Sequence, residues 1–367
     1  MTKLIEGKKI AVIGAGPIGL AVAVLLQQKG ADITVFERDA DKQSRFWGGT
    51  LDLHDNMGLA ALSAAGLLPE FYAVSRSVGE RVFDAAANLI SETSAQRETG
   101  EPVRPEIDRA SLNNLLIAAL APGTVCYGIK FTHLRKAAGA YQLFFEDGFI
   151  GRADLVIAAD GAESLLRQYV TTGQNEYSGT CIIQGEISDP RNNCRGICEL
   201  AGKFNLMATG ENKMIFAQER GDGSLIYYVS FLQAPDAQPA AGSDRAEMKD
   251  FLKRMYAGFN PVFFELFTAT DYFMVLPMVN HPVGPAWDIT EEITLVGDAA
   301  HVMPPYAGHG VNLGLLDALI LSSNLTGASF GTISQALRDY EQQMRIYVLK
   351  AQQDTTQLEL GMHTSVK

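Results

Sequence analysis

The chain has 367 residues, of which 47% are hydrophobic and 20% are charged, so it can bury the cores of about two domains. Its formal net charge of -12 argues against binding to nucleic acid or to an anionic membrane surface, because both are themselves negatively charged. No apolar run reaches the roughly 18 residues of a membrane span, we expect no signal peptide, and four cysteines favour the reducing cytoplasm.

The first forty residues have the pattern of a nucleotide-binding unit. We expect a strand at Lys9–Val12, a helix from Leu20 to about Lys29 and a second strand at Ile33–Phe36. The loop before the helix carries three spaced glycines, Gly14, Gly16 and Gly19. In such a βαβ unit the glycines permit a tight turn, a close approach of a pyrophosphate and close packing of helix and strand.

An acidic residue, Glu37, ends the second strand about 20 residues after these glycines. A carboxylate here can accept hydrogen bonds from both hydroxyls of an adenosine ribose and disfavours a 2′-phosphate. The unit therefore predicts bound FAD or NAD. Arg38 is either a contact to the adenine or ribose, or a surface residue.

Several segments then lead to a second buried strand. They are the glycine-bearing loop Arg45–His54, a helix at Gly58–Ala65, a strand pair within Ser77–Glu92, a polar and mobile stretch at Gln96–Val103, and a helix that opens at Ile107–Leu112 and runs to about Leu120. Residues 154–159 predict a buried strand that delivers Asp160 and Gly161 to its carboxyl end. We expect a helix carrying Arg167 after it.

Residues 180–273 have a different sequence pattern, with short β-rich runs separated by turns. The runs are Thr180–Ile187, Ile197–Leu200, Asn205–Thr209, Met214–Gln218 and Leu225–Leu232. They predict an antiparallel sheet, which we interpret as a substrate domain. A Pro/Ala/Gly linker at Asp236–Ser243 precedes a helix at Asp244–Tyr256, and Phe273–Met278 is expected to return the chain to the nucleotide domain.

The strongest pattern lies in residues 293–317. A strand at Ile293–Val296 is followed by Gly297 and Asp298, and then by prolines and glycines until a helix begins near Val311. A glycine-rich loop that opens a helix offers backbone N–H groups to a ring system or an anion. Asp298, as a carboxylate, accepts hydrogen bonds and suits a ribityl or ribose hydroxyl. A long helix at Ser334–Ala351 closes the chain.

Three of these motifs together resemble the class A FAD-dependent aromatic hydroxylases. The matches are the glycine unit, Asp160-Gly161, and a run with GD at Gly297, PP at Pro304, GxGxN at Gly308 and DA at Asp317. The resemblance covers about Lys8 to Met362. It implies an α/β fold with a Rossmann-like FAD-binding domain (1–76, 102–172 and 273–325), an antiparallel β-sheet substrate domain (77–101 and 173–272) and a long C-terminal bridging helix (332–361).

The resemblance also implies which residues contact FAD: Gly14, Gly16, Gly19, Glu37, Arg38, Asp52, Arg109, Asp160, Asp298, Pro305, Gly308, Gly310 and Asn312. In the family an arginine at the position of Arg109 places its guanidinium over the flavin. The alternative is a surface ion pair with Asp108 or Glu106. Asp52 lies in a loop that resembles the flavin-side loop of the tetracycline-inactivating monooxygenases, and the alternative is a helix cap in a structural loop.

Within the family the chain most resembles these tetracycline-inactivating enzymes, which implies substrate contacts from Gln184, Asn205, Phe216, Ile226, Tyr306, Gly308 and Met362. Three positions depart from that branch. Asn205 and Ile226 stand where it has an arginine and a histidine, and Leu358 replaces a polar residue. Each lost hydrogen bond is worth roughly 0.5–3 kcal/mol, so tetracycline is expected to bind differently or more weakly, or not to be the natural substrate. Gln184 and Phe216 are alternatively plain sheet residues.

The resemblance implies a monooxygenase that uses FAD and NADPH or NADH. In the family O2 adds at the flavin C4a, and the hydroperoxide hydroxylates an electron-rich enol or phenol. Three hypotheses follow: hydroxylation of tetracycline-type antibiotics, hydroxylation of another aromatic or polyketide substrate, or a flavin-binding protein without turnover. We assign no catalytic side chain, because the flavin carries the chemistry. We expect a monomer and no metal site, since the six histidines lack HxxxH or HExxH spacing.

Overall fold

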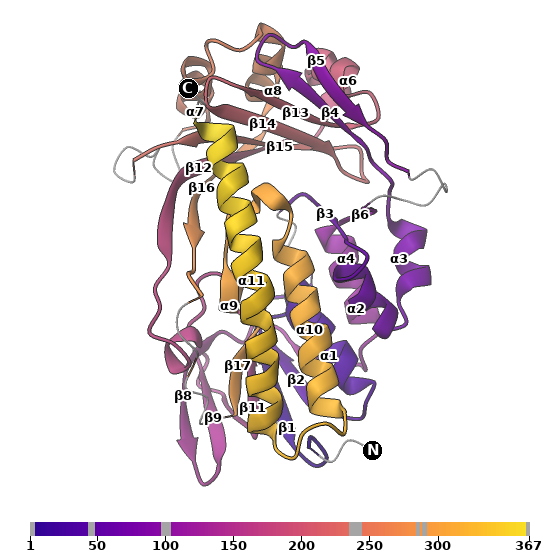
Figure 1. Ribbon diagram of the computed structural model, residues 1–367, viewed down its shortest axis with the longest axis vertical. Helices are drawn as coiled ribbons and strands as arrows, with labels where there is room; N and C mark the ends of the chain where they lie inside the picture. Colours follow the sequence, from indigo (N-terminus) through magenta and orange to yellow (C-terminus); the bar gives the residue numbers. More distant parts are fainter. Residues whose placement is uncertain are drawn as a thin grey trace.

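A computed structural model describes residues 4–42, 48–96, 104–234, 244–283, 287 and 292–364. The predicted features at Arg45–Trp47, at 97–103 and at the 236–243 linker lie outside these residues. The elements surround two hydrophobic cores. A long C-terminal helix, α11 (Ile333–His363), runs along the molecule from one core to the other (Figure 1).

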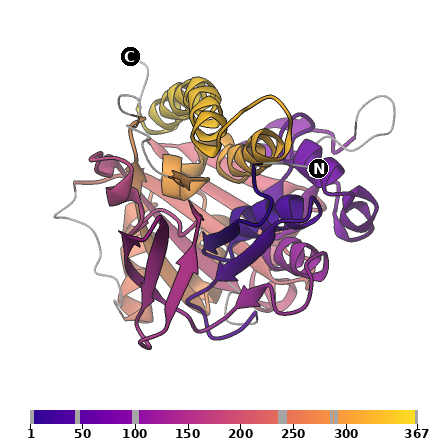
Figure 2. The same ribbon diagram turned by 90° about the horizontal axis from the view of Figure 1, so that it is seen from below.

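The first core surrounds a five-stranded parallel sheet. Its order is β17 (Ile293–Leu295), β11 (Leu155–Ala158), β1 (Lys9–Ile13), β2 (Asp32–Phe36) and β7 (Val125–Cys126). The helices of this part are α1 (Pro17–Gln27), α2 (Gly58–Ala64), α3 (Leu68–Val74), α4 (Arg109–Ala118), α9 (Asp298–His301) and α10 (Gly310–Thr326). Viewed along the long axis, α10 and α11 lie together over one side of this sheet (Figure 2). Parallel strands buried between helices explain the continuous apolar runs in the sequence.

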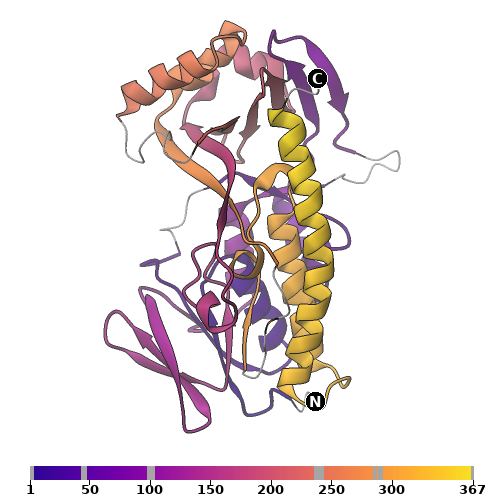
Figure 3. The same ribbon diagram turned by 60° about the vertical axis from the view of Figure 1, so that its left-hand side comes forward.

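The second core lies under a seven-stranded sheet. Its order is β16 (Tyr272–Asn280), β12 (Glu176–Ile187), β15 (Leu225–Leu232), β14 (Lys213–Glu219), β13 (Asn205–Gly210), β4 (Glu80–Asp84) and β5 (Leu89–Thr93). The helices of this part are α5 (Pro190–Asn193), α6 (Arg195–Ala201), α7 (Arg245–Met255) and α8 (Phe264–Ala269). Residues of α6, α7 and α8 pack into this core against one face of the sheet. The long strands β12 and β16 extend toward the parallel sheet (Figure 3).

Smaller elements complete the fold. They are the hairpin sheet of β8 (Phe131–Ala137), β9 (Ala140–Phe145) and β10 (Ile150–Ala153), the strand pair β3 (Thr50–Asp52) and β6 (Glu106–Asp108), and the 3₁₀ turns η1 (Arg167–Tyr169), η3 (Pro261–Phe263) and η4 (Pro305–Ala307). The predicted fold class is confirmed: a Rossmann-like α/β part, a largely antiparallel sheet and a long C-terminal helix.

Four local predictions were wrong. Residues 197–200 belong to helix α6, whose Ile197 and Ala201 turn one face to the core. Ile107 lies in strand β6, and the helix begins only at Arg109. Arg167 lies in a 3₁₀ turn rather than a helix. Strand β16 pairs with β12 along most of its length, so residues 272–280 belong to the seven-stranded sheet. Periodicity over four to nine residues does not reveal which partner a segment will find.

Candidate functional site

The loop between β1 and α1 has no room for side chains at two predicted glycines. Gly14 has φ +105°, and a Cβ there would lie 2.3 Å from the carbonyl oxygen of Ala159. A Cβ at Gly19 would lie 2.1 Å from the carbonyl oxygen of Gly14. Gly16 is the N-cap of α1 and supplies no side-chain cap. The loop therefore presents bare backbone N–H groups at the positive end of a helix, which suits a pyrophosphate.

Glu37 is almost completely buried at the end of β2. Its Oε2 accepts a hydrogen bond from the N–H of Ala15 at 2.6 Å, and its Oε1 accepts one from the N–H of Asp39 at 3.0 Å. The carboxylate thus holds the glycine loop in place, and a ribose contact would be an addition to this role. Arg38, the next residue, is exposed.

The turn after β17 has a fixed backbone and an exposed carboxylate. Gly297 has φ +59°, and Asp298 begins α9 with its side chain exposed. Arg167, which is 7% exposed, donates from Nη2 to the carbonyl of Asp298 and from Nε to the carbonyl of Ala299, both at 2.8 Å. These bonds orient the turn and leave the Asp298 carboxylate for a ligand.

A buried carboxylate, Asp317, holds the same turn from the other side. Its Oδ2 accepts hydrogen bonds from the N–H of Gly297 at 2.7 Å and from Nε2 of His301 at 2.6 Å. Its Oδ1 accepts one from the hydroxyl of Tyr347 on α11. Asp317 and His301 are both 0% exposed. The motif around Asp317 was recognised in the sequence, but its role as the link between α9, α10 and α11 was not.

Asp160 follows β11 next to the glycine loop. Its Oδ2 accepts a hydrogen bond from the N–H of Leu165 at 2.9 Å, and burial raises the pKa of this carboxyl group. Its Oδ1 is buried and has no hydrogen-bond partner among the described residues. A buried acceptor without a partner is costly, so this atom is suited to accept from a ligand.

The loop that carries Asp52 is tied to the start of α10. A Cβ at Gly308, which has φ +65°, would lie 3.2 Å from Asp52 Oδ1. Asn312 is fully buried, donates from Nδ2 to the carbonyl of Asp52 at 2.8 Å and accepts from the N–H of His54 at 2.8 Å. Asn312 is therefore a brace between two loops. Pro305 is exposed at the start of η4, and Gly310 opens α10 with no atom near a Cβ position.

Two glycines earlier in the same loop bring it against Arg109 and the seven-stranded sheet. A Cβ at Gly48 would lie 2.9 Å from Nε of Arg109, and one at Gly49 would lie 2.7 Å from the phenol oxygen of Tyr228. The N–H of Gly49 donates to that oxygen at 2.9 Å. The Arg109 guanidinium makes no hydrogen bond or ion pair to a described residue, which does not match the alternative of a pair with Asp108 or Glu106. Asp108 pairs instead with Arg76.

One face of the seven-stranded sheet points away from α6–α8 and toward these loops. Cross-strand pairing aligns Met274, Gln184, Tyr228, Phe216 and Met207 in one row on this face. The predicted substrate residues Gln184 and Phe216 thus lie directly on either side of Tyr228. Tyr228 was missed in the sequence analysis, although alternation along β15 from the core residue Tyr227 would have indicated it.

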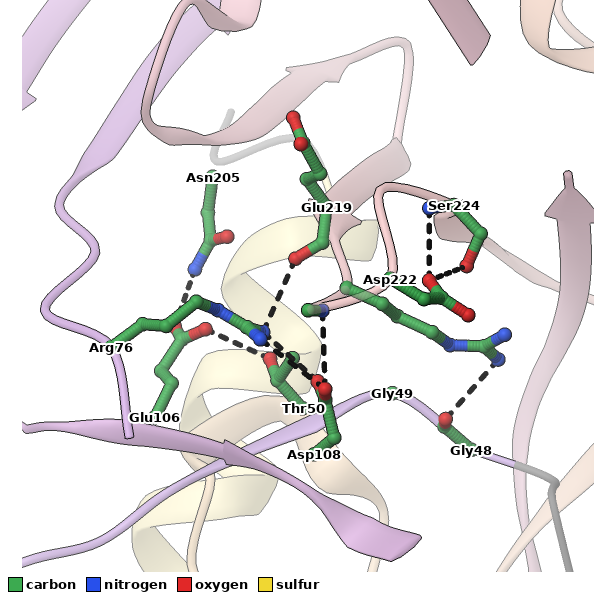
Figure 4. A network of polar contacts seen from close by, with 12 residues as sticks. Gly48, Gly49, Thr50, Arg76, Glu106, Asp108, Asn205, Glu219, Asp222 and Ser224 are labelled. Atoms are coloured by element: carbon green, nitrogen blue, oxygen red, sulfur yellow. Dashed lines mark hydrogen bonds and ion pairs between the residues drawn. The ribbon is translucent and has the colours of Figure 1, made fainter. Parts of the chain in front are cut away.

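Asn205 and Ile226 lie on the same face and contact the β3–β6 side of the molecule. Asn205 is 6% exposed and donates from Nδ2 to Oε1 of Glu106 at 2.6 Å, and Glu106 also accepts from the hydroxyl of Thr50 (Figure 4). Ile226 is 0% exposed, and its Cγ2 would lie 3.5 Å from a Cβ at Gly49. Both side chains therefore belong to the contact between the sheet and the β3–β6 pair.

Charged groups close this contact at its edge. Arg76 makes a double hydrogen bond to Asp108 at 2.9 and 3.2 Å, and Figure 4 shows it reaching also toward the carbonyl of Glu219. Arg220 donates to the carbonyl of Gly48 at 3.2 Å and pairs with Glu186 at 3.0 Å. The loop at Gly48 and Gly49 is thus tied to the seven-stranded sheet by side chains of the sheet and of the segment at Arg76.

The remaining predicted residues lie near the end of α11. The phenol oxygen of Tyr306 in η4 lies 2.7 Å from Oγ of Ser230, and burial raises its pKa to about 12. Met362 is half-buried in the last turn of α11, whereas Leu358 is 44% exposed. Among the described residues, no group of three His, Cys, Asp or Glu side chains is placed to hold a metal ion, and no helix is long and apolar enough to cross a membrane.

Comparisons with known proteins identify the family. Residues 286–355 match the model of an FAD binding domain, and residues 12–42 match an NAD(P)-binding Rossmann-like domain. The FAD-dependent urate hydroxylase of Klebsiella pneumoniae is 30% identical over 94% of this chain and 88% of its own length. The chain belongs to the class A FAD-dependent aromatic hydroxylases.

Solved structures of such hydroxylases share the fold. Klebsiella pneumoniae HpxO in complex with FAD and uric acid superposes with a TM-score of 0.81 at 23% identity, over 99% of this chain and 90% of that one. The tetracycline destructase Tet(55) gives a TM-score of 0.76 at 24% identity, over 96% and 89%. At these identities the likeness concerns the fold.

The residues of this hydroxylase fit FAD. The free helix end at Gly16, the orphaned Oδ1 of Asp160 and the exposed carboxylate of Asp298 offer the donors and acceptors that a dinucleotide needs. The Arg109 guanidinium, which has no described partner, offers a planar cation for a flavin ring. Gly16, Asp160 and Asp298 follow the parallel strands β1, β11 and β17 at their carboxyl ends, where ligands bind in open α/β sheets, and Arg109 begins α4 beside Gly48.

Proposed function

We propose that this chain is an FAD- and NAD(P)H-dependent monooxygenase that hydroxylates an electron-rich phenol or enol of a fused-ring substrate, with tetracycline-type antibiotics as the first candidates. One observation carries the proposal. The loop beside Arg109 contacts the Gln184–Tyr228–Phe216 row of the sheet, because Gly48 and Gly49 have no side chains to keep the two apart. A flavin held at Arg109 would then lie next to a face that offers both aromatic and polar groups.

In this proposal FAD, reduced by NADPH as the expected donor, supplies the activation of O2 when it is bound. The chain's own residues bind, orient and shield. The glycine loop and Glu37 would hold the pyrophosphate and ribose, and Asp298 and Asp160 would accept from hydroxyls of the cofactor. Phe216 and Tyr228 would contact the substrate rings and keep water away from them.

A second candidate is a hydroxylase of another aromatic or polyketide substrate. It is favoured by the burial of Asn205 and Ile226, which gives these positions a structural role. The relative with 30% identity is a urate hydroxylase, so the family accepts substrates other than tetracycline. A flavin-binding protein without turnover is the third candidate, and its sign would be negligible NAD(P)H oxidation with every phenol tested.

The test uses the purified protein with FAD. The flavin spectrum is recorded, and NADPH and NADH oxidation and product mass are followed with and without tetracycline. Coupled NADPH oxidation and a gain of one oxygen would support the first candidate. Bound FAD without tetracycline-dependent oxidation would shift the proposal to another substrate. A protein that takes up no FAD would refute the proposal.

We further propose the division into an FAD-binding part (1–76, 102–172 and 273–325), a substrate-binding part (77–101 and 173–272) and the bridging helix (332–361), with residues 273–280 moved to the substrate-binding part because β16 belongs to its sheet. We also propose a monomer in the cytoplasm. Size-exclusion chromatography with light scattering tests the monomer, and limited proteolysis tests the division.

A further inference from the structure

Three side chains from different elements form a hydrogen-bonded chain beside the sheet face. His363 in the last turn of α11 and Ser230 on β15 are both 0% exposed. Oγ of Ser230 lies 2.6 Å from Nε2 of His363 and 2.7 Å from the phenol oxygen of Tyr306. Nδ1 of His363 lies 2.7 Å from the carbonyl oxygen of Glu359. The chain thus runs from the helix end to Tyr306.

The partners fix the direction of every bond in this chain. A backbone carbonyl only accepts, so Nδ1 of His363 carries the proton, and Nε2 of the neutral ring is an acceptor. The hydroxyl of Ser230 must then donate to Nε2. Because Ser230 has given its one proton to His363, the hydroxyl of Tyr306 must donate to Ser230. Burial lowers the pKa of His363, which agrees with a neutral ring.

The neighbouring hydroxyls have no proton left for Tyr306. Thr180 donates to Oε1 of Glu359 at 2.5 Å, and Ser178 donates to the same oxygen at 2.7 Å. Both hydroxyl protons are thus directed to the Glu359 carboxyl group, which is 5% exposed. The lone pairs of the Tyr306 oxygen therefore stay available as hydrogen-bond acceptors for a ligand.

The orientation of the Gln184 side-chain amide is fixed as well, so that its oxygen serves as an acceptor. Its Nε2 donates to Oε1 of Glu186 at 2.8 Å, and Glu186 is paired with Arg220. A carboxylate accepts only, so the amide cannot be turned the other way without placing two oxygens together. The Gln184 carbonyl oxygen makes no hydrogen bond to a described residue. Gln184 lies diagonally across from Ser230, because Ile182 is the direct partner of Ser230, so the two acceptors belong to one region of the sheet face.

We propose that Tyr306 and Gln184 are specificity-determining hydrogen-bond acceptors, held in that role by His363 and Glu186, and that they select an aromatic or enolic substrate that presents two hydroxyl or N–H donors. This inference rests on the proposed function and narrows its substrate class. A ligand that presents ether or carboxylate oxygens to the same two positions meets acceptors only. It binds more weakly because neither oxygen finds a proton.

The first test needs no substrate or substrate analogue. Nitrogen-15 NMR of histidine-labelled, FAD-loaded protein reports which ring nitrogen of His363 carries the proton, and the His363→Gln variant assigns its signal among the six histidines. We expect the proton on Nδ1 and a shift of the Nε2 signal in Ser230→Ala. A proton on Nε2, or on both nitrogens, reverses the bond to Ser230 and overturns the inference.

The second test compares two probes that differ only in their donors, 2,7-dihydroxynaphthalene and 2,7-dimethoxynaphthalene. Binding to the FAD-loaded protein is measured by calorimetry. We expect the diol to bind at least about tenfold more tightly. In Ser230→Ala the Tyr306 proton is released to serve an ether oxygen, so the ratio should fall toward one. Thr356→Ala is the control, because it removes an exposed hydroxyl of α11, the helix that carries His363, and it should keep the ratio.

The outcomes separate this inference from the proposed function. Equal binding of the two probes, a ratio that survives in Ser230→Ala, or no binding of either probe to FAD-loaded protein overturns the inference. Hydroxylation of any phenol by the same preparation would leave the proposed function standing. A protein that takes up no FAD would overturn both.

Discussion

Asp317→Asn is expected to weaken the turn that carries Asp298. The carboxylate accepts three hydrogen bonds, and the amide keeps one acceptor oxygen and adds an NH2 group. The hydroxyl of Tyr347 can rotate to accept from that group, so the loss concentrates on the pair with His301. Breaking a fully buried ion pair from one side costs about 3–5 kcal/mol. Rotation of Tyr347 recovers part of this, and we expect a loss of about 3 kcal/mol in the free energy of unfolding.

Urea unfolding followed by circular dichroism measures this loss, and the flavin absorbance of the purified variant reports the state of the turn. We expect a lower midpoint and a reduced FAD content. Asp354→Asn is the control, because Asp354 pairs with Lys350 on the surface of α11, where such a pair contributes about 0–1 kcal/mol. A loss in Asp317→Asn no larger than in this control would refute the role of the buried pair.

The same pair predicts a dependence on pH. Burial alone lowers the pKa of His301, but the charge of Asp317 and the hydrogen bond to it outweigh burial and raise the pKa above the ordinary 6.5. The folded state therefore binds this proton more tightly than the unfolded state. The stabilisation is complete below the ordinary value and is lost as the pH rises through the raised one. In Asp317→Asn this slope should disappear.

Three further predictions concern single side chains. Asp298→Ala should purify largely without FAD although its unfolding midpoint stays near that of the wild type, and full flavin content would contradict the assigned contact. Gly14→Ala should lose FAD and stability, since its Cβ would overlap a backbone carbonyl, whereas Gly361→Ala on the open side of α11 should gain up to about 1 kcal/mol in urea unfolding. Burial raises the pKa of Glu341 to about 8 from 4.5, so wild-type stability should fall as the pH rises across that range, and Glu341→Gln should flatten the profile of melting temperature against pH.

The sequence predicted those parts of the fold whose signal is local. The glycines at 14, 16 and 19, the acid at 37 and the turn at 297 each need a particular backbone, so their spacing identifies the unit and the family. Partners far apart in the chain have no such signal. Asp317 binds Gly297, His301 and Tyr347 across three helices, and its motif alone does not name these partners. The strand at 106–108 forms because Thr50–Asp52 pairs with it, and residues 107–112 by themselves suit a helix equally well.

The positions that depart from the tetracycline-inactivating branch also have partners far away in the chain, which the sequence does not reveal. These partners change what the departures imply about the substrate. By alignment, Asn205 and Ile226 replace an arginine and a histidine of a substrate site. Here Asn205 is bonded to the buried Glu106, and Ile226 is covered by the loop at Gly49. An isoleucine suits that dry contact, and an amide is the neutral donor that Glu106 accepts from. These two residues are therefore explained by the contact between sheet and loop, and neither is free to replace the two missing contacts to tetracycline, which favours another substrate. The test of the substrate shifts to the acceptors at Gln184 and Tyr306.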